Sequence, residues 1–225
     1  KMKNFSITPI EIIKSFTKNR SLIYQMSKRE VVGRYKGSLM GLLWSFFNPA
    51  LMLVIYTFVF SIIFKARWPG VTNNLEFAGI LFAGLIIYSL FSECISRSPS
   101  LILSNVNYVK KVIFPLEILS WIALGSSLFH ASVSVIVLLG FMLFLTGGLH
   151  WTVVLFPLVI FPLLLLTMGI SWILASLGTY SRDIGQVISF IVMAMMFMSP
   201  IFFPSSAFPE SYRVLFYLNP LTFII

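Results

Sequence analysis

The chain has 225 residues, 58% of them hydrophobic and only 10% charged, and its mean hydropathy is +0.95. Soluble domains carry about 25% charged residues, so this composition excludes an ordinary soluble domain and indicates one polytopic membrane domain. The formal net charge of +9 would suit a nucleic-acid-binding protein, but the basic residues are scattered at segment ends and form no stripe. That pattern is typical of membrane proteins, in which basic residues set orientation and meet anionic lipid.

Residues 1–40 are predicted to form a cytoplasmic amphipathic segment ahead of the first membrane span. Thr8 can cap a helix that begins at Pro9, and Glu11 lies three residues after the cap, as in a capping box. The apolar side of this helix consists of Ile12, Ile13, Phe16 and Ile23. We therefore expect the helix to lie on the inner leaflet, with an exposed helix that makes no membrane contact as the alternative.

A second basic segment, residues 28–36, leads into the membrane. Its periodicity is poor, and we interpret it as helical from its position and composition. Arg29, Glu30 and Arg34 belong to this segment and complete the candidate residues of the N-terminal interface.

Five segments are apolar enough and long enough to cross a bilayer, which takes about 20 residues. Their predicted ranges are 42–64, 77–98, 113–145, 152–177 and 184–203. The strongest signal is the run between Glu117 and Arg182, where 64 consecutive residues carry no charge. A turn is predicted within it at Thr146–Trp151, where small and polar residues cluster. The chain becomes apolar again at Val214–Ile225, so a sixth span is expected to be missing or truncated.

The basic residues outside the spans predict the orientation of the chain. With a cytoplasmic N-terminus, 13 Lys and Arg residues lie on the inner side and 3 on the outer side. This distribution agrees with the positive-inside rule. Near the inner end of the second span, Glu93 and Arg97 are one helical turn apart and can neutralise each other.

Two inner segments are candidates for contact with a cytoplasmic partner. The loop at residues 98–117 is too long for a turn and suits a short helix, parallel to the membrane, that docks into a partner's groove; an ordinary interfacial linker is the alternative. The turn at residues 179–184 places Asp183 where it can cap the fifth span, while Arg182 faces anionic head groups. The candidate contact residues are Asn105, Tyr108, Val109, Lys110, Lys111, Arg182 and Asp183.

The outer segment at residues 199–220 contains four prolines, which break any straight helix. Broken apolar helices at membrane depth are tolerated where they line a cavity or pack against protein. We therefore expect residues 204–225 to form a re-entrant pair of short helices that gate the outer face, with an interfacial loop as the alternative. The candidate gate residues are Pro200, Phe202, Phe203, Pro204, Phe208, Tyr212, Asn219 and Pro220.

Aromatic residues crowd the first span, and aromatic faces are stacking surfaces for sugar rings. The candidates for lining a channel there are Trp44, Phe47, Tyr56 and Phe60. Catalytic signals are weak by comparison: His130 and His150 stand alone, as packing histidines do, and the seven acidic residues form no close pair for acid–base chemistry. The phosphate-binding pattern GxxxxGK[ST] does not occur. The sequence thus predicts no enzyme and no cofactor bound by this chain.

Several short motifs, in this order and spacing, resemble those of the ABC-2 type permeases that export lipid-linked polysaccharides such as O-antigen, capsule and teichoic acid. The most specific motifs are residues 28–44 with Asn48-Pro49, residues 105–117, residues 182–186, and residues 199–202 followed by 218–220. The likeness covers the whole chain and is strongest to the O-antigen export permeases of Gram-negative bacteria.

This resemblance implies an all-α polytopic fold, the ABC-2 (type V-like) exporter transmembrane domain, with six spans of which five are complete here. It implies a homodimer in the bacterial inner membrane together with two copies of a separate ATP-binding cassette subunit. That subunit would hold ATP and Mg and would contact residues 105–111 and the N-terminal helix. The implied substrate is an undecaprenyl-diphosphate-linked polysaccharide.

Two other functions stay open at this point. The first is an ABC-2 exporter of drugs or small amphiphiles, and teichoic acid is a further substrate on the same scaffold. The second is a membrane transferase acting on lipid-linked sugars, but the outer acids and histidine (Glu76, His150 and Glu210) are scattered apart. A secondary transporter would need ionisable residues at mid-span for ion coupling, whereas most of those here lie near the inner ends of spans.

Overall fold

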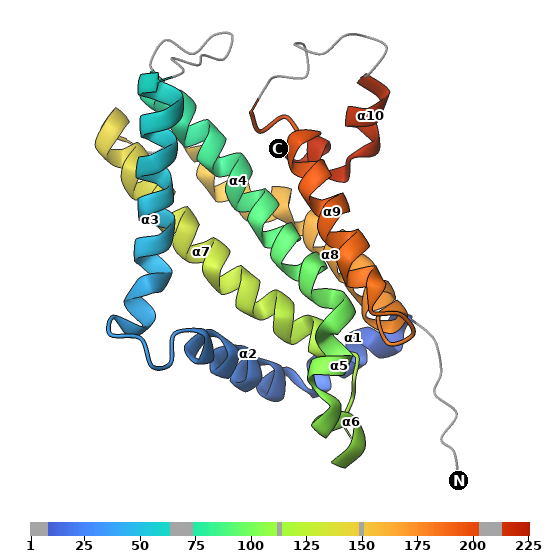
Figure 1. The fold of residues 1–225 in the computed structure, drawn as a ribbon. Coiled ribbons are helices and arrows are strands. Elements are labelled where there is room, and N and C mark those ends of the chain that lie inside the picture. Colours follow the sequence, from blue (N-terminus) through green and yellow to red (C-terminus); the bar gives the residue numbers. More distant parts are fainter. Residues whose placement is uncertain (1–8, 64–73, 112–113, 149–150, 203–212) are drawn as a thin grey trace.

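The computed structural model describes residues 9–63, 74–111, 114–148, 151–202 and 213–225, and every regular element in these ranges is helical. The elements are, in chain order, α1 Pro9–Lys18, α2 Arg20–Arg34, η1 Gly41–Leu43, α3 Trp44–Tyr56, the π-helical η2 Thr57–Ile63, α4 Asn74–Arg97, η3 Ser98–Ser100, α5 Leu101–Ser104, α6 Val106–Lys111, α7 Ile118–Thr146, η4 Trp151–Leu155, α8 Phe156–Leu177, α9 Asp183–Phe197, α10 Arg213–Leu218 and η7 Pro220–Phe223. Figure 1 shows the long helices side by side, with α1 and α2 across one end. We call this end, which also carries α5 and α6, the basic end of the bundle. The expected all-α fold is confirmed.

The N-terminal segment forms two helices that break at Asn19. The side-chain amide of Asn19 donates to the carbonyl oxygen of Ser15 at 2.9 Å and so stabilises the end of α1. The first helix includes Pro9 from its beginning, as predicted, whereas the expected cap Thr8 lies outside the described residues.

Two residues of the predicted apolar stripe, Phe16 and Ile23, pack against α7, whereas the side chains of Ile12 and Ile13 lie outside the described part of the structure. The ring centroids of Phe16 and Trp121 are 4.5 Å apart, and Ile23 is buried in a cluster with Ile118 and Ile122. The sequence pattern, interpreted as a membrane-facing stripe, therefore also serves helix packing. The basic segment 28–36 is helical as far as Arg34.

The first span stands at the edge of the bundle (Figure 1). A helix covers the predicted range as far as Ile63, and Gly41–Phe60 has the length and hydropathy of a membrane span. Only Ser45 and Leu53 of α3 are buried. Most of this helix is thus free to face lipid or another protein.

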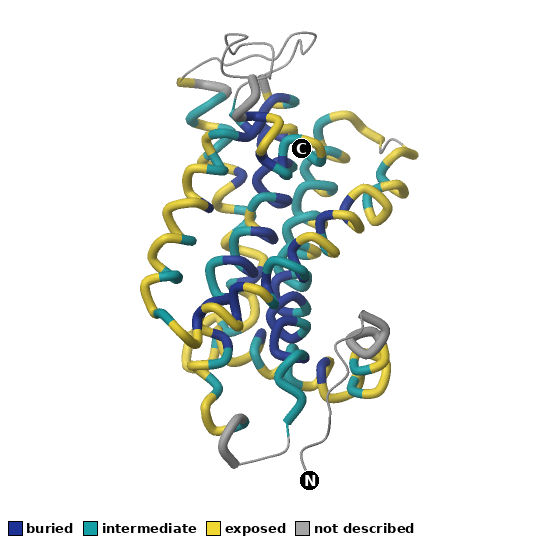
Figure 2. The backbone as a smooth tube through the Cα atoms, turned by 90° about the vertical axis from the view of Figure 1, so that its right-hand side faces the viewer, coloured by how far each residue is buried: buried dark blue, intermediate teal, exposed yellow. Residues whose placement is uncertain are grey.

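The central helix is α4. Together with the residues that follow, it forms a candidate span over Leu75–Ser104, and two thirds of its apolar window is buried. Phe77, Leu81, Leu90 and Phe91 are among its fully buried side chains. Figure 2 shows this buried centre in dark blue between helices whose outer faces are exposed.

The third span begins later than predicted, at Ile118 and not at residue 113. Pro115 explains the difference, because the residue before a proline is disfavoured in helical geometry. A turn follows, in which Ile118 donates its backbone N–H to the Pro115 carbonyl oxygen at 3.1 Å. At the other end, Gly147 has a φ of 70° and stops α7 where the turn was predicted.

The fifth predicted span is shorter in the structure than in the sequence analysis. The 15 residues of α9 rise about 22 Å, less than the roughly 30 Å of a hydrocarbon core. Within the described residues, four helices have the length and composition of a membrane span. The predicted cap is also wrong: Asp183 lies inside the first turn, and its backbone N–H donates to the Ser181 hydroxyl at 3.3 Å.

After α9 the chain forms short elements, as the prolines predict. α10 and η7 lie beside the end of α9 that is opposite to the basic end (Figure 1). Leu221 of η7 is fully buried in the core cluster that also contains Leu90, Leu163 and Val192. This end of the described chain therefore packs into the bundle.

Candidate functional site

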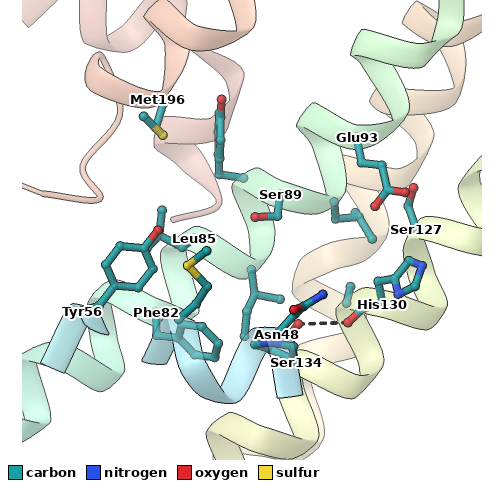
Figure 3. A pocket seen from close by; sticks show the side chains of 16 residues that line it. Asn48, Tyr56, Phe82, Leu85, Ser89, Glu93, Ser127, His130, Ser134 and Met196 are labelled. Atoms are coloured by element: carbon teal, nitrogen blue, oxygen red, sulfur yellow. Dashed lines mark hydrogen bonds between the residues drawn. The ribbon is translucent and has the colours of Figure 1, made fainter. Parts of the chain in front are cut away.

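A cavity of about 300 Å³ lies between α3, α4 and α7, with Met196 of α9 on its wall (Figure 3). Its apolar side includes Met52, Phe82 and Leu85. The polar and aromatic side chains around it are Asn48, Tyr56, Tyr88, Ser89, Glu93, Ser127, His130 and Ser134. Such a lining offers ring faces for stacking together with hydroxyl, amide and imidazole groups for hydrogen bonding.

His130 marks the polar part of the cavity. Its Nδ1 atom lies 3.4 Å from the hydroxyl of Tyr35, and the two rings meet edge to face with centroids 5.9 Å apart. Burial raises the pKa of Tyr35 further above neutral pH, and its protonated hydroxyl can donate to His130. The other nitrogen, Nε2, is buried and has no partner among the described residues. His130, interpreted from the sequence as a packing residue, thus lines the cavity while its Nε2 atom stays buried behind the wall.

Glu93 joins the cavity to a row of alternating charges that crosses from α4 to α2. Its carboxylate pairs with the guanidinium of Arg34 and lies 3.5 Å from Arg97. Arg97 continues the row to Glu30 at 2.5 Å. The predicted mutual neutralisation of Glu93 and Arg97 is present, but each residue also has a second partner on α2.

The loop at residues 98–117, predicted to contact a cytoplasmic partner and called the coupling loop below, contains two short helices, α5 and α6, that extend below α4 at the basic end (Figure 1). Asn105 separates them, and its side-chain amide donates to the Leu101 carbonyl oxygen at 2.8 Å. Tyr108 is held in place: its hydroxyl accepts from Arg29 at 2.5 Å, and its ring stacks on Phe114 at 4.9 Å. The side chains of Val109, Lys110 and Lys111 lie outside the described part of the structure.

The second predicted contact segment lies close to the first. The hydroxyls of Ser98 and Ser171 form a hydrogen bond of 2.7 Å, which ties η3 to α8. Just beyond, Gly178 approaches Pro99 so closely that a Cβ atom would lie 2.0 Å from the Pro99 carbonyl oxygen. These contacts bring the turn with Arg182 and Asp183 to the basic end, beside the start of the coupling loop.

The expected gate residues fall into two groups. Phe202 stacks on Phe60 and Phe197, with ring centroids 5.8 Å and 6.0 Å apart, and Pro200 is buried. Phe203, Pro204, Phe208 and Tyr212 lie outside the described residues.

Asn219 connects the end of α9 to the start of η7. Its amide donates to the carbonyl oxygens of Met195 and Met198 at 2.9 Å and 3.0 Å, and its Oδ1 accepts from the Leu221 backbone N–H at 3.1 Å. It therefore caps the end of α9 and the beginning of η7, which starts at Pro220.

Two of the four candidate channel aromatics lie together. Tyr56 lines the cavity, and its ring centroid is 6.5 Å from that of Phe60, which also packs on Phe77 and Phe202. Trp44 and Phe47 do not line the cavity, and Phe47 is 39% exposed. The sequence analysis did not identify the polar lining. The spacing of Asn48 and Tyr56, eight residues apart on one helix, is a signal that could have indicated it. Within the described residues no three His, Cys, Asp or Glu side chains gather to hold a metal ion.

A family model described as ABC-2 type transporter matches residues 21–225, and the chain therefore belongs to the ABC-2 type transporter family. The chain is 28% identical to the O-antigen export system permease protein RfbA of Myxococcus xanthus, over 94% of this chain and 80% of the relative. It is 29% identical to an RfbA protein of Klebsiella pneumoniae, over 91% and 77%. The polysialic acid transport protein KpsM of Escherichia coli is 25% identical, over 88% and 75%.

These findings confirm the resemblance drawn from the sequence motifs. With its four long apolar helices, the chain is a multi-pass integral membrane protein. The family suggests a transport subunit without an enzymatic reaction of its own and implies an ATP-binding partner subunit.

Proposed function

We propose that this chain is the permease subunit of an exporter that moves undecaprenyl-diphosphate-linked polysaccharide, of the O-antigen class, across the bacterial inner membrane. The names of its relatives support the substrate class. The structural observation that carries the proposal is the cavity between α3, α4 and α7, because it combines aromatic rings with hydroxyl and amide groups inside a membrane domain.

The cavity suits a neutral, hydroxyl-rich chain. Tyr56 and Tyr88 offer faces on which sugar rings can stack, while Asn48 and Ser89 can exchange hydrogen bonds with sugar hydroxyls. The negative charge of Glu93 is balanced by Arg34 and Arg97, so the cavity presents no strong net charge. Weak, repeated contacts of this kind hold a polymer in line and still let it slide.

A homodimer would complete the path. A cavity of about 300 Å³ in one subunit is too small for a polymer with its lipid anchor. Both α3 and α9 carry large exposed apolar side chains, such as Phe46 and Val54 on one and Phe190 and Met193 on the other. A second copy that covers part of these faces would turn two cavities into one pore.

The basic end would face the cytoplasm and receive two copies of the ATP-binding subunit, which hold ATP and Mg while this chain binds no cofactor. The contact residues would be those of α5–α6 and of the turn with Arg182 and Asp183. The hydrogen bond from Arg29 to Tyr108 and the ion pair of Arg34 with Glu93 provide a physical path from this contact to the cavity. A displacement of α6 would thus move α2 and α4 together.

The opposite end would hold the outer gate. The stack of Phe60, Phe197 and Phe202 supports this role, because packed aromatic rings exclude water and ions from an idle pore. Residues 203–212 would extend the gate, and α9 together with the residues that follow it would make the fifth crossing.

A deletion strain that lacks this chain provides the test of the proposal. We expect this strain to lose the glycan from the surface and to accumulate it, linked to its lipid, on the cytoplasmic side of the membrane. The parent chain should restore export. Ser89→Trp, which fills the cavity, should not restore it. Ser132→Trp, on an exposed face of α7, is the control and should restore export. Normal surface glycan combined with a loss of small-amphiphile efflux would support the drug-exporter alternative.

A further inference from the structure

A second, larger hollow lies outside the proposed path. This groove, of about 480 Å³, runs between α2 and the first half of α7, with Leu42 of η1 at its edge. Its walls are apolar and include Ile23, Val31 and Phe129. The volume falls within the roughly 300–1,000 Å³ typical of ligand pockets.

One close contact fixes the groove in place. The hydroxyl of Ser27 donates to the Ile122 carbonyl oxygen at 3.2 Å, and a Cβ atom on Gly125 would lie 2.6 Å from that hydroxyl. At Gly125, the Ser27 side chain of α2 therefore lies directly against the backbone of α7. The groove is a fixed feature of this packing, because Ile23 and Val31, on either side of Ser27, are both buried.

From the length of α7, we expect the groove to lie at the level where head groups give way to acyl chains. The 29 residues of α7 rise about 43 Å, which matches a whole bilayer with its head groups and exceeds the roughly 30 Å hydrocarbon core. The first turn of α7 therefore lies among head groups. Gly125, about 10 Å further along the helix, lies just inside the hydrocarbon.

The rim of the groove is cationic. Arg20 and Lys28 both line it and are exposed, and no ion pair among the described residues includes either of them. Nearby, Tyr24 and Val32 are 69% and 50% exposed, so the apolar wall is open toward the membrane surface. An apolar slot beside two unpaired cations complements an acyl chain attached to a phosphate.

We propose that this groove is a binding site for an anionic glycerophospholipid of the cytoplasmic leaflet. One acyl chain lies against Val31, Leu42 and Phe129, and the phosphate lies between Arg20 and Lys28. The lipid holds α2 at the membrane surface and makes its position depend on membrane composition. This site takes a resident lipid and is distinct from the path proposed for the exported glycan.

Photolabelling of the full-length permease, purified with its partner subunits into lipid nanodiscs, tests the site. The probes are phosphatidylglycerol and phosphatidylcholine with the same photoreactive acyl chain, at equal mole fraction. We expect adducts in the segments 16–32 and 125–129, with phosphatidylglycerol favoured on the order of thirtyfold, since each basic side chain near anionic lipid contributes about fivefold.

The variant Arg20→Gln/Lys28→Gln should lower that preference to near one while the protein stays folded, because both side chains are exposed. The matched control Lys14→Gln/Lys18→Gln removes two exposed charges of α1 that do not line the groove and should retain the preference. Equal labelling by both probes in the parent protein, an equal loss in the control, or protection of the groove by the ATP-binding subunit in place of lipid would overturn the proposal.

Discussion

Glu93 belongs to two parts of the molecule at once. It lines the cavity between α3, α4 and α7, and it pairs with Arg34 of α2. Its side chain is 21% exposed, so the pair is only partly desolvated and each contact contributes about 1 kcal/mol at most. The importance of Glu93 therefore lies more in connecting α2 to the cavity than in stability.

We expect Glu93→Gln to lower the free energy of unfolding by about 1–2 kcal/mol, because Arg34 and Arg97 lose a common partner. Export should fall more than stability does, since α2 is no longer tied to α4. The double variant Arg34→Gln/Glu93→Gln should be no worse than Glu93→Gln alone in thermal unfolding. Strictly additive losses in that double-mutant cycle would show that the pair does not interact.

Tyr108 provides the second residue-level test. Tyr108→Phe removes the hydroxyl that accepts from Arg29 but retains the stack on Phe114. We expect the ATP-binding subunit to co-purify as before, while export falls several-fold because α6 and α2 move separately. Tyr217→Phe, at the far end of the bundle, is the control. Full export by Tyr108→Phe would show that the hydrogen bond between Arg29 and Tyr108 does not contribute to coupling.

Local spacing predicts only part of this arrangement. The contact between Glu93 and Arg97 follows from four-residue spacing on one helix. The pairing of Arg34 with Glu93 joins residues 59 positions apart, and no period in the sequence indicates it. The same holds for His130, whose polar neighbour Tyr35 comes from another element.

At the scale of elements, the contact between α8 and η3 depends on a missing side chain. A Cβ atom on Gly178 would lie 2.0 Å from the Pro99 carbonyl oxygen and 2.6 Å from its Cα atom. Both are backbone atoms, so an added methyl group cannot be accommodated by rotating a side chain. Gly178 thus keeps the turn that leads into α9 next to the start of the coupling loop.

We expect Gly178→Ala to cost about 1–3 kcal/mol through overpacking and to weaken association with the ATP-binding subunit. Gly169→Ala, inside α8, is the control, since its Cβ would meet nothing within 4 Å. The control should be neutral or stabilising by up to about 1 kcal/mol, because alanine favours a helix over glycine. Thermal unfolding in nanodiscs measures both, and equal midpoints for Gly178→Ala and Gly169→Ala would contradict the packing argument.

Asn219 plays the corresponding role at the opposite end. Asn219→Ala removes two donated bonds and one accepted bond, so we expect a loss of about 1–3 kcal/mol and faster amide exchange in η7. Asn219→Asp keeps the acceptor for Leu221 but cannot donate to the carbonyl oxygens of α9. It should be nearly as destabilising as alanine; a parent-like Asn219→Asp would mean that the two donated bonds are unimportant.

The sequence predicts the elements better than their ends. Long apolar runs and the turn before Gly147 place α7 and α8, because hydropathy and glycine chemistry are local. The end of α9 is capped by Asn219, a contact between segments more than 20 residues apart that no local pattern indicates. The packing of Phe16 and Ile23 against α7 was missed for the same reason, since an apolar stripe alone does not distinguish lipid from protein.

At the scale of the whole molecule, α4 connects the cavity to the basic end. It separates the cavity on one side from the tightly packed cluster with α8 on the other, and its lower end continues into α5 and α6. A displacement of the basic end would therefore be transmitted to the cavity through the single helix α4.

We expect disulfide crosslinks between copies, formed by cysteines at exposed positions of α3 in a Cys94→Ala background, to stop export.

Those crosslinks also test the homodimer. Phe46→Cys and Val54→Cys place the thiol on the exposed face of α3, and either position can face a second copy or lipid. Crosslinking at one of them that blocks export would support a pore between two copies. If crosslinked protein exports at the parent rate, the pore does not lie at that face.

The most direct test is translocation in a purified system. The permease and its ATP-binding subunit are reconstituted into liposomes with a fluorescent undecaprenyl-diphosphate-linked glycan. ATP is then added, and a glycosidase outside the liposomes reports the fraction of the glycan that becomes protected from it or newly exposed to it. We predict ATP-dependent movement of the glycan across the bilayer by the parent protein and none by Ser89→Trp, at equal ATP hydrolysis. Movement that does not need ATP, or an undiminished rate in Ser89→Trp, would contradict the cavity as the path of export.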